Sequence, residues 1–144
     1  MEIHQSAVIL LLIWSVSSFT HGQPADIWKR YEKFRNQHVI PDMTEDMCTR
    51  VIKSRRINVN GHPCKRVNSF IAANEHQINE VCGRGGTPQG GDLFESNQRF
   101  FVVKCTSSGG TYYPNCQYSG RSYTSKIVLL CDRGWPVHYE PMNG

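Results

Sequence analysis

Histidine and lysine side chains are the residues in this chain best suited to proton transfer and anion stabilisation. Four of the six histidines lie after residue 22, at His38, His62, His76 and His138. Histidine titrates near neutral pH and can act as a general acid or base. Lys65 directly follows Cys64, so a disulfide there would hold a cation that can stabilise an anion. Each of these residues could equally have an ordinary structural or surface role.

The N-terminal segment differs in composition from the rest of the chain. Residues 7–14 are an unbroken apolar run, shorter than the roughly 20 apolar residues that span a bilayer. The run and the small residues Thr20 and Gly22 predict a secretory signal peptide over residues 1–22, although no lysine or arginine precedes the run. A short N-terminal anchor is the alternative. Residues 23–144 have the length of one domain.

Composition and cysteine count narrow the class of protein further. With 39% hydrophobic and 19% charged residues, the chain is not of the disordered class, and its net charge of +4 favours an anionic partner. Six cysteines in an oxidising compartment predict three disulfides, whose pairing the count leaves open. The chain has no Cys-x-x-Cys pair, so a structural zinc site is not favoured.

The pattern of apolar residues predicts helices in the first part of the chain and strands in the second. Ile27, Tyr31, Phe34 and His38 recur at helical spacing, which predicts a helix over 25–37 with His38 at the end of its buried face. Further helices are expected over 43–52 and 75–81. Strands are expected over 99–104, 112–118, 125–131 and 137–139, with a Gly-rich loop over 83–91. This order indicates an α+β fold.

Four segments resemble one known family. Residues 64–70, Cys-Lys-Arg-Val-Asn-Ser-Phe, resemble the Cys-Lys-x-x-Asn-Thr-Phe signature of the pancreatic-type ribonuclease (ribonuclease A) superfamily. Residues 33–38, 113–116 and 136–140 resemble its N-terminal helix ending in Gln-His, its Tyr-Pro-Asn-Cys stretch and its C-terminal Val-His-Phe-Asp segment. The order and spacing agree over residues 24–140. Six cysteines, where most members have eight, resemble the three-disulfide, angiogenin-like branch.

The resemblance implies a fold and a disulfide pattern. The fold would be a ribonuclease A-like domain over 23–144, with three helices packed on a bent antiparallel β-sheet and the active site in a cleft. The implied disulfides are Cys48–Cys105, Cys64–Cys116 and Cys82–Cys131. Members of the family often have a cis peptide bond before the proline at the position of Pro114, and such bonds occur almost only before proline.

The resemblance also implies the catalytic residues. His38 would be the general base that deprotonates the ribose 2′-OH, and His138 the general acid that protonates the leaving 5′-oxygen. Lys65 would stabilise the charged transition state. The reaction would need no cofactor and no metal, would spare DNA, and would leave a 2′,3′-cyclic phosphate. Because base and acid must be in opposite protonation states, a bell-shaped pH profile is expected.

Substrate-binding positions follow from the same resemblance. They are Gln37 near the phosphate, Asn68 of the Cys-Lys-x-x-Asn-Thr-Phe signature, Ser69 as the residue that reads the pyrimidine ring, Tyr139 beside the base, and Glu140 as the carboxylate that orients His138. The leading prediction is a secreted, monomeric endoribonuclease that cleaves single-stranded RNA 3′ of pyrimidines. Ribonuclease inhibitor-type proteins would be further partners.

The chain departs from the family pattern at several positions. Glu140 is one methylene longer than the aspartate usual there, and Lys104 replaces an aspartate that supports the base-reading threonine. The Gly-rich stretch 83–91 lacks the extra disulfide loop that binds the downstream purine, so that subsite is expected to be weak. Pro141 stands where angiogenins have a glutamine that obstructs the pyrimidine pocket, so that obstruction is expected to be absent.

Two other functions compete with RNA degradation. An angiogenin-like signalling protein with weak ribonuclease activity would use the basic residues Lys53, Arg55 and Arg56 for uptake to the nucleus or nucleolus; the same residues would also suit a solvated helix end. A cationic antimicrobial host-defence protein would bind an anionic cell surface or bacterial membrane, although no strongly cationic amphipathic stretch is present.

Overall fold

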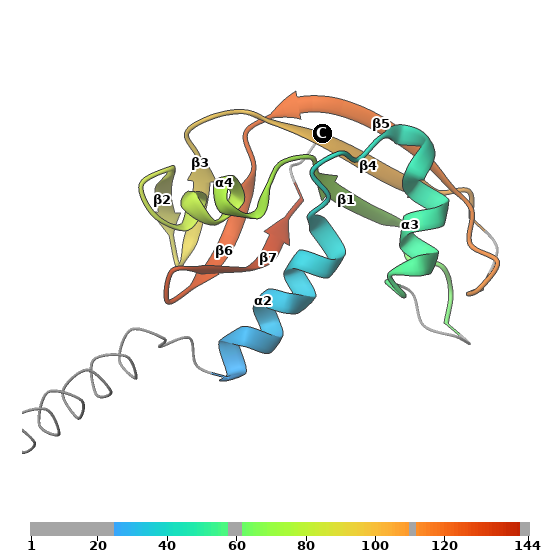
Figure 1. The fold of residues 1–144 in the computed structure, drawn as a ribbon, viewed down its shortest axis with the longest axis horizontal. Helices are drawn as coiled ribbons and strands as arrows, with labels where there is room; N and C mark the ends of the chain where they lie inside the picture. Colours follow the sequence, from blue (N-terminus) through green and yellow to red (C-terminus); the bar gives the residue numbers. More distant parts are fainter. Residues whose placement is uncertain (1–24, 58–61, 110–111, 142–144) are drawn as a thin grey trace, which may run out of the picture.

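The computed structural model describes residues 25–57, 62–109 and 112–141 (Figure 1). The signal peptide expected over residues 1–22 lies outside these ranges and stays a prediction. Within the described part of the chain, no helix is both long and apolar enough to cross a membrane.

The helices of the described chain all lie before residue 83. Helix α2 (Ala25–His38) buries Ile27, Tyr31, Phe34 and His38, which confirms the face predicted from helical spacing. The 3-10 turn η1 (Glu45–Met47) leads into α3 (Cys48–Ser54), and α4 (Glu75–Asn79) continues into the 3-10 turn η2 (Glu80–Cys82). The helices expected over 43–52 and 75–81 are therefore present, each divided into an α-helical and a 3-10 part.

The strands pair antiparallel and form two sheets. One sheet has the order β1 (Val67–Ile71), β4 (Phe100–Ser107), β5 (Tyr118–Ser125). The other has the order β2 (Gly86–Gly90), β3 (Leu93–Ser96), β6 (Val128–Asp132), β7 (Trp135–Glu140). Helix α2 packs against β7 of one sheet and β1 of the other, and Figure 1 shows it crossing below both. The C-terminal end of α2 therefore lies where the two sheets meet.

Two of the strand and loop predictions were wrong. Residues 112–117 are not a strand: Tyr112 makes only an isolated bridge to Pro63, and Tyr118 begins β5. The Tyr113–Pro114 peptide bond is cis. The Gly-rich stretch is not wholly a loop, because β2 uses Gly86–Gly90. Gly86 is required there: a Cβ atom would lie 1.9 Å from the carbonyl oxygen of Val81.

Two clusters of buried side chains and three disulfides hold these elements together. The larger cluster joins α2 to α4, η2 and the second sheet, and the smaller one lies between α3 and the first sheet. Strand β1 contributes Ile71 to the larger cluster and Phe70 to the smaller one, so it is buried on both faces. The cysteines are bonded as the resemblance implies, Cys48–Cys105, Cys64–Cys116 and Cys82–Cys131.

Candidate active site

A cleft of about 620 Å³ opens where the two sheets meet above the end of α2. It brings together His38 from α2, Lys65 from the segment before β1, and His138 from β7. The other lining residues come from the same segments and from β1, β4, β5 and the C-terminal end: Gln37, Arg66, Val67, Asn68, Ser69, Lys104, Tyr123, Tyr139 and Pro141. Three segments far apart in the sequence thus meet in one cavity.

His38 is the buried histidine of the cleft. Its side chain lies at the end of α2, 8% exposed, between Phe34 and Tyr139, and its ring stacks on Tyr139 with centroids 5.2 Å apart. Nδ1 lies 2.8 Å from the carbonyl oxygen of Ser69. A carbonyl can only accept, so Nδ1 carries the hydrogen in this bond and Nε2 keeps the free lone pair. Nε2 can therefore accept a proton.

The environment of His38 keeps its imidazole neutral. Burial lowers the pKa of His38 to about 4, against the opposing effect of the hydrogen bond to Ser69. The positive charges of Lys65 and His138 lower it further. At neutral pH this group is a neutral base, the protonation state that proton abstraction requires.

Lys65 is held in the cleft by a short chain of polar contacts. Its Nζ donates to Oδ1 of Asn68 over 2.8 Å, and Nδ2 of Asn68 donates to the carbonyl oxygen of Gln37 over 2.8 Å. Asn68 is only 2% exposed, so it joins the lysine to the last turn of α2 from a buried position. Burial, and then the charge of Lys33, lower the pKa of Lys65.

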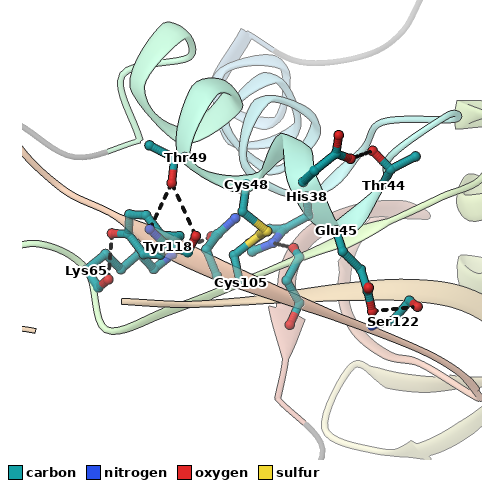
Figure 2. Close-up of a disulfide and its surroundings, with 12 residues drawn as sticks. His38, Thr44, Glu45, Cys48, Thr49, Lys65, Cys105, Tyr118 and Ser122 are labelled. Atoms are coloured by element: carbon teal, nitrogen blue, oxygen red, sulfur yellow. Dashed lines mark hydrogen bonds between the residues drawn. A yellow bond between two sulfur atoms is a disulfide. The ribbon is translucent and has the colours of Figure 1, made fainter. Parts of the chain in front are cut away.

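The backbone of Lys65 is anchored from the other side as well. Cys64, its neighbour, is bonded to Cys116, and the hydroxyl of Tyr118 donates to the carbonyl oxygen of Lys65 over 2.6 Å. Figure 2 shows Tyr118 between Lys65 and Thr49, whose hydroxyl bonds to the backbone N–H and C=O of Tyr118. The lysine is thus tied through β5 to α3.

His138 lies on the open side of the cleft. Its Nε2 is 3.3 Å from Oε1 of Glu140, and the two side chains are 55% and 41% exposed. Strand alternation places His138 and Glu140 on one face of β7 and turns Tyr139 into the core. Although Glu140 is one methylene longer than aspartate, its carboxylate reaches the imidazole of His138. The contact is made by Nε2, so Nδ1 of His138 is not involved in it.

Polar side chains surround Ser69 in one part of the cleft. In the ladder between β1 and β4, Ser69 lies opposite Lys104. The hydroxyl of Tyr139 hydrogen-bonds with Ser69 and Tyr123, and burial together with Tyr123 raises the pKa of Tyr139. Pro141, at the C-terminal end, also lines the cleft. Tyr123 is a site residue that sequence reasoning missed, because nothing in the polar sequence of β5 distinguishes it.

Other residues considered from the sequence lie outside the cleft. His76 is on α4, with its Nε2 3.8 Å from Glu80, and neither it nor His62 lines the cavity. Of the basic residues near the end of α3, Lys53 and Arg56 are exposed. Arg55 is partly buried, and its Nη1 donates to the carbonyl oxygens of Asn36 and Val39, both over 2.9 Å.

The chain was compared with known protein families, relatives and solved structures. The family model described as pancreatic ribonuclease matches residues 29–140. The chain is 46% identical to "Ribonuclease-like 3" of Danio rerio, over 97% of each protein, and 39% identical to "Angiogenin-3" of Mus musculus, over 77% of each. Among solved structures it is similar to zebrafish RNase5, with a TM-score of 0.77 and 48% identity, covering 82% of this chain and 98% of that one. By its sequence and by its fold, the chain belongs to the pancreatic ribonuclease family.

Proposed function

We propose that this protein is a secreted endoribonuclease that cleaves single-stranded RNA on the 3′ side of pyrimidines without a metal. The observation that carries the proposal is the pairing, in one cleft, of a buried neutral histidine with an exposed histidine that faces a carboxylate. His38 and His138 have the complementary environments that a general base and a general acid need. Membership of the ribonuclease family supports the same chemistry.

The proposed reaction is an intramolecular transphosphorylation. Nε2 of His38 takes the proton of the ribose 2′-OH, and the 2′-oxygen attacks the adjacent phosphorus. The bond from phosphorus to the 5′-oxygen of the next nucleotide breaks, and His138 protonates that oxygen through Nδ1. The ammonium of Lys65 stabilises the negative charge that builds on the phosphoryl oxygens. The products are a 2′,3′-cyclic phosphate and a 5′-hydroxyl.

The region around Ser69 supports a preference for pyrimidines. The Ser69 hydroxyl can both donate and accept a hydrogen bond, so it can match either uracil or cytosine. Tyr123, Tyr139 and Pro141 enclose the space around it and favour a single-ring base. The glutamine that would obstruct this space in angiogenins is replaced by Pro141.

The test is cleavage of a short RNA with one internal pyrimidine–adenine step by the oxidised protein in EDTA. We expect a 2′,3′-cyclic product from the wild type and a loss of at least about a hundredfold in His138→Ala, the range for removal of a general acid. A matched change outside the cleft, His76→Ala, should leave the rate unchanged. No cleavage by correctly oxidised wild type would refute the proposal.

A second candidate, an angiogenin-like signalling protein, is favoured by the exposure of Lys53 and Arg56. A nuclear import receptor could reach these two side chains. Loss of nuclear uptake in the Lys53→Ala/Arg56→Ala variant, with RNA cleavage retained, would support this role. Unchanged uptake would count against it. Arg55 should be left intact in that experiment because its side chain is engaged with the end of α2.

A further inference from the structure

The hydroxyl of Ser69 has few partners to choose from, because the residue is only 7% exposed. The carbonyl oxygen of Ser69 is engaged with Nδ1 of His38, 2.8 Å away, and the side chain lines the cleft. A hydroxyl has one hydrogen to donate and two lone pairs that accept. The partners that the protein supplies therefore decide whether Ser69 presents a hydrogen or a lone pair to a bound base.

Tyr139 is the first of these partners. Its hydroxyl hydrogen-bonds with Ser69 and with Tyr123. Tyr139 is 5% exposed and its ring stacks on His38, so packing holds the hydroxyl in this place. A phenol is more acidic than an alcohol, which makes it the better donor and the poorer acceptor. The favoured arrangement is therefore that Tyr139 donates to Ser69 and accepts from Tyr123.

Lys104 is the second partner that the fold places beside this hydroxyl. It lies directly opposite Ser69 in the ladder between β1 and β4, and it lines the same cleft. The side chains of such a pair share one face of the sheet, with Cβ atoms about 5 Å apart. An ammonium has three hydrogens and no lone pair, so Lys104 can donate to Ser69 but cannot accept from it. Among the described residues that line the cleft there is no aspartate or glutamate, so the cleft offers Ser69 no carboxylate acceptor.

The oxygen of Ser69 thus faces two donors, and its own hydrogen is left for the base. N3 of cytosine has a lone pair that accepts this hydrogen. N3 of uracil carries a hydrogen of its own, which would meet the hydrogen of Ser69. Uracil could bond only if the hydroxyl turned and gave up a bond from Tyr139 or Lys104. One neutral hydrogen bond gained or lost in a buried site corresponds to about tenfold in binding.

We propose that Tyr139 and Lys104 are specificity-determining residues, which hold the Ser69 hydroxyl as a donor and make the enzyme prefer cytosine to uracil. The inference rests on the proposed function, and it narrows the base on the 5′ side of the cleaved bond from any pyrimidine to cytosine. The hydroxyl of Tyr123 is not needed for this preference, because without it Ser69 is the acceptor that remains for Tyr139.

The test compares kcat/KM for two dinucleotides that differ only in the pyrimidine, cytidylyl-adenosine and uridylyl-adenosine. The wild type should favour cytosine by about tenfold. Tyr139→Phe keeps the ring on His38 but removes the donor, so the ratio of the two values should fall towards one. Tyr123→Phe is the matched loss of a tyrosine hydroxyl from the same cleft, and it should keep the wild-type ratio.

A second variant reverses the polarity of the other partner. Lys104→Glu places an acceptor opposite Ser69, which takes the hydrogen of the hydroxyl and leaves a lone pair for the N3–H of uracil. The ratio should therefore shift towards uracil. A variant that is merely less well folded lowers both kcat/KM values alike and leaves their ratio unchanged, so the ratio separates specificity from stability.

The outcomes also separate this inference from the proposed function. Equal cleavage of the two dinucleotides by the wild type, a preference for uracil, or an unchanged ratio in either Tyr139→Phe or Lys104→Glu would overturn the inference and leave the proposed function standing. If the wild type cleaves neither dinucleotide, the proposed function fails. Affinities for cytidine 3′-phosphate and uridine 3′-phosphate then still test the pocket, and equal affinities would overturn the inference.

Discussion

At the scale of single residues, burial of His38 sets the pH range in which it can act as a base. Its pKa is lowered to about 4, well below the 6.5 of an ordinary histidine. The profile of kcat/KM against pH reports the groups of the free enzyme. We therefore predict that the acid side of this profile falls off near pH 4 to 5.

Measurement of kcat/KM from pH 3.5 to 8 on the pyrimidine–adenine dinucleotide checks this prediction. Circular dichroism at each pH serves as the control that the protein is folded. An acid limb with its midpoint at 6.5 or above, in protein that is still folded, would contradict a buried, neutral His38.

Arg55 is predicted to act as a positioning residue for His38. Its guanidinium donates to the carbonyl oxygens of Asn36 and Val39, which flank Gln37 and His38, and Nδ2 of Asn36 donates back to the carbonyl oxygen of Arg55. Small displacements of a catalytic group can cost up to about a hundredfold in rate. We expect Arg55→Ala to lower kcat by about tenfold with little change in KM.

Two further variants make the Arg55 prediction specific. Arg55→Lys keeps a donor at the same place and should recover part of kcat. Arg50→Ala removes the same charge from an exposed position of α3 and should leave kcat unchanged. If Arg55→Ala changes only the stability, and kcat at a temperature where it is folded equals that of the wild type, the positioning role is wrong.

At the scale of elements, two disulfides are expected to contribute similarly to stability but differently to activity. Cys64–Cys116 and Cys82–Cys131 span 52 and 49 residues, so their effects on the entropy of the unfolded chain are nearly equal. Removing either is expected to cost about 2–5 kcal/mol of unfolding free energy. Only Cys64–Cys116 adjoins Lys65 and the backbone that carries it.

We therefore predict unequal effects on activity from two matched double variants. Cys64→Ala/Cys116→Ala should lose more cleavage activity than Cys82→Ala/Cys131→Ala, at a temperature at which both remain folded. Denaturant unfolding gives the stability of each, and dinucleotide cleavage gives the activity. Equal losses of activity would show that the disulfide beside Lys65 contributes stability alone.

At the scale of the whole molecule, the buried histidine makes folding stability depend on pH. The pKa of His38 is about 4 in the folded protein and near 6.5 in the unfolded chain, so the unfolded chain binds more protons between these values. The stabilisation is fully present above pH 6.5 and is lost as the pH falls towards 4. The expected loss by pH 5 is about 2 kcal/mol.

Urea unfolding at pH 7 and pH 5 measures this loss. To isolate the contribution of His38, the wild type is compared with His38→Gln, which keeps a polar side chain at the site. The drop in stability between the two pH values should be smaller in His38→Gln by about 2 kcal/mol. The same drop in both proteins would place the acid sensitivity elsewhere.

Most of the correct predictions of the fold and the candidate site came from periodic apolar residues and short motifs. The face of α2 followed from the spacing of Ile27, Tyr31 and Phe34. Strand β1 was not predicted from its pattern, because Asn68 and Ser69 are polar yet buried. Their burial depends on partners from elsewhere in the chain: Asn68 bonds to Lys65 and to Gln37, and Ser69 bonds through its carbonyl to His38.

The α+β class, the three disulfides, the main helix and, through the motifs, the family with its candidate residues could all be predicted from the sequence. These properties depend on local periodicity and on residue identity. The folded structure was needed to establish that His38 and His138 line one cleft and that His38 is neutral. Charge environment and cavities depend on the distances between distant segments, and those distances exist only after the two sheets have packed on α2.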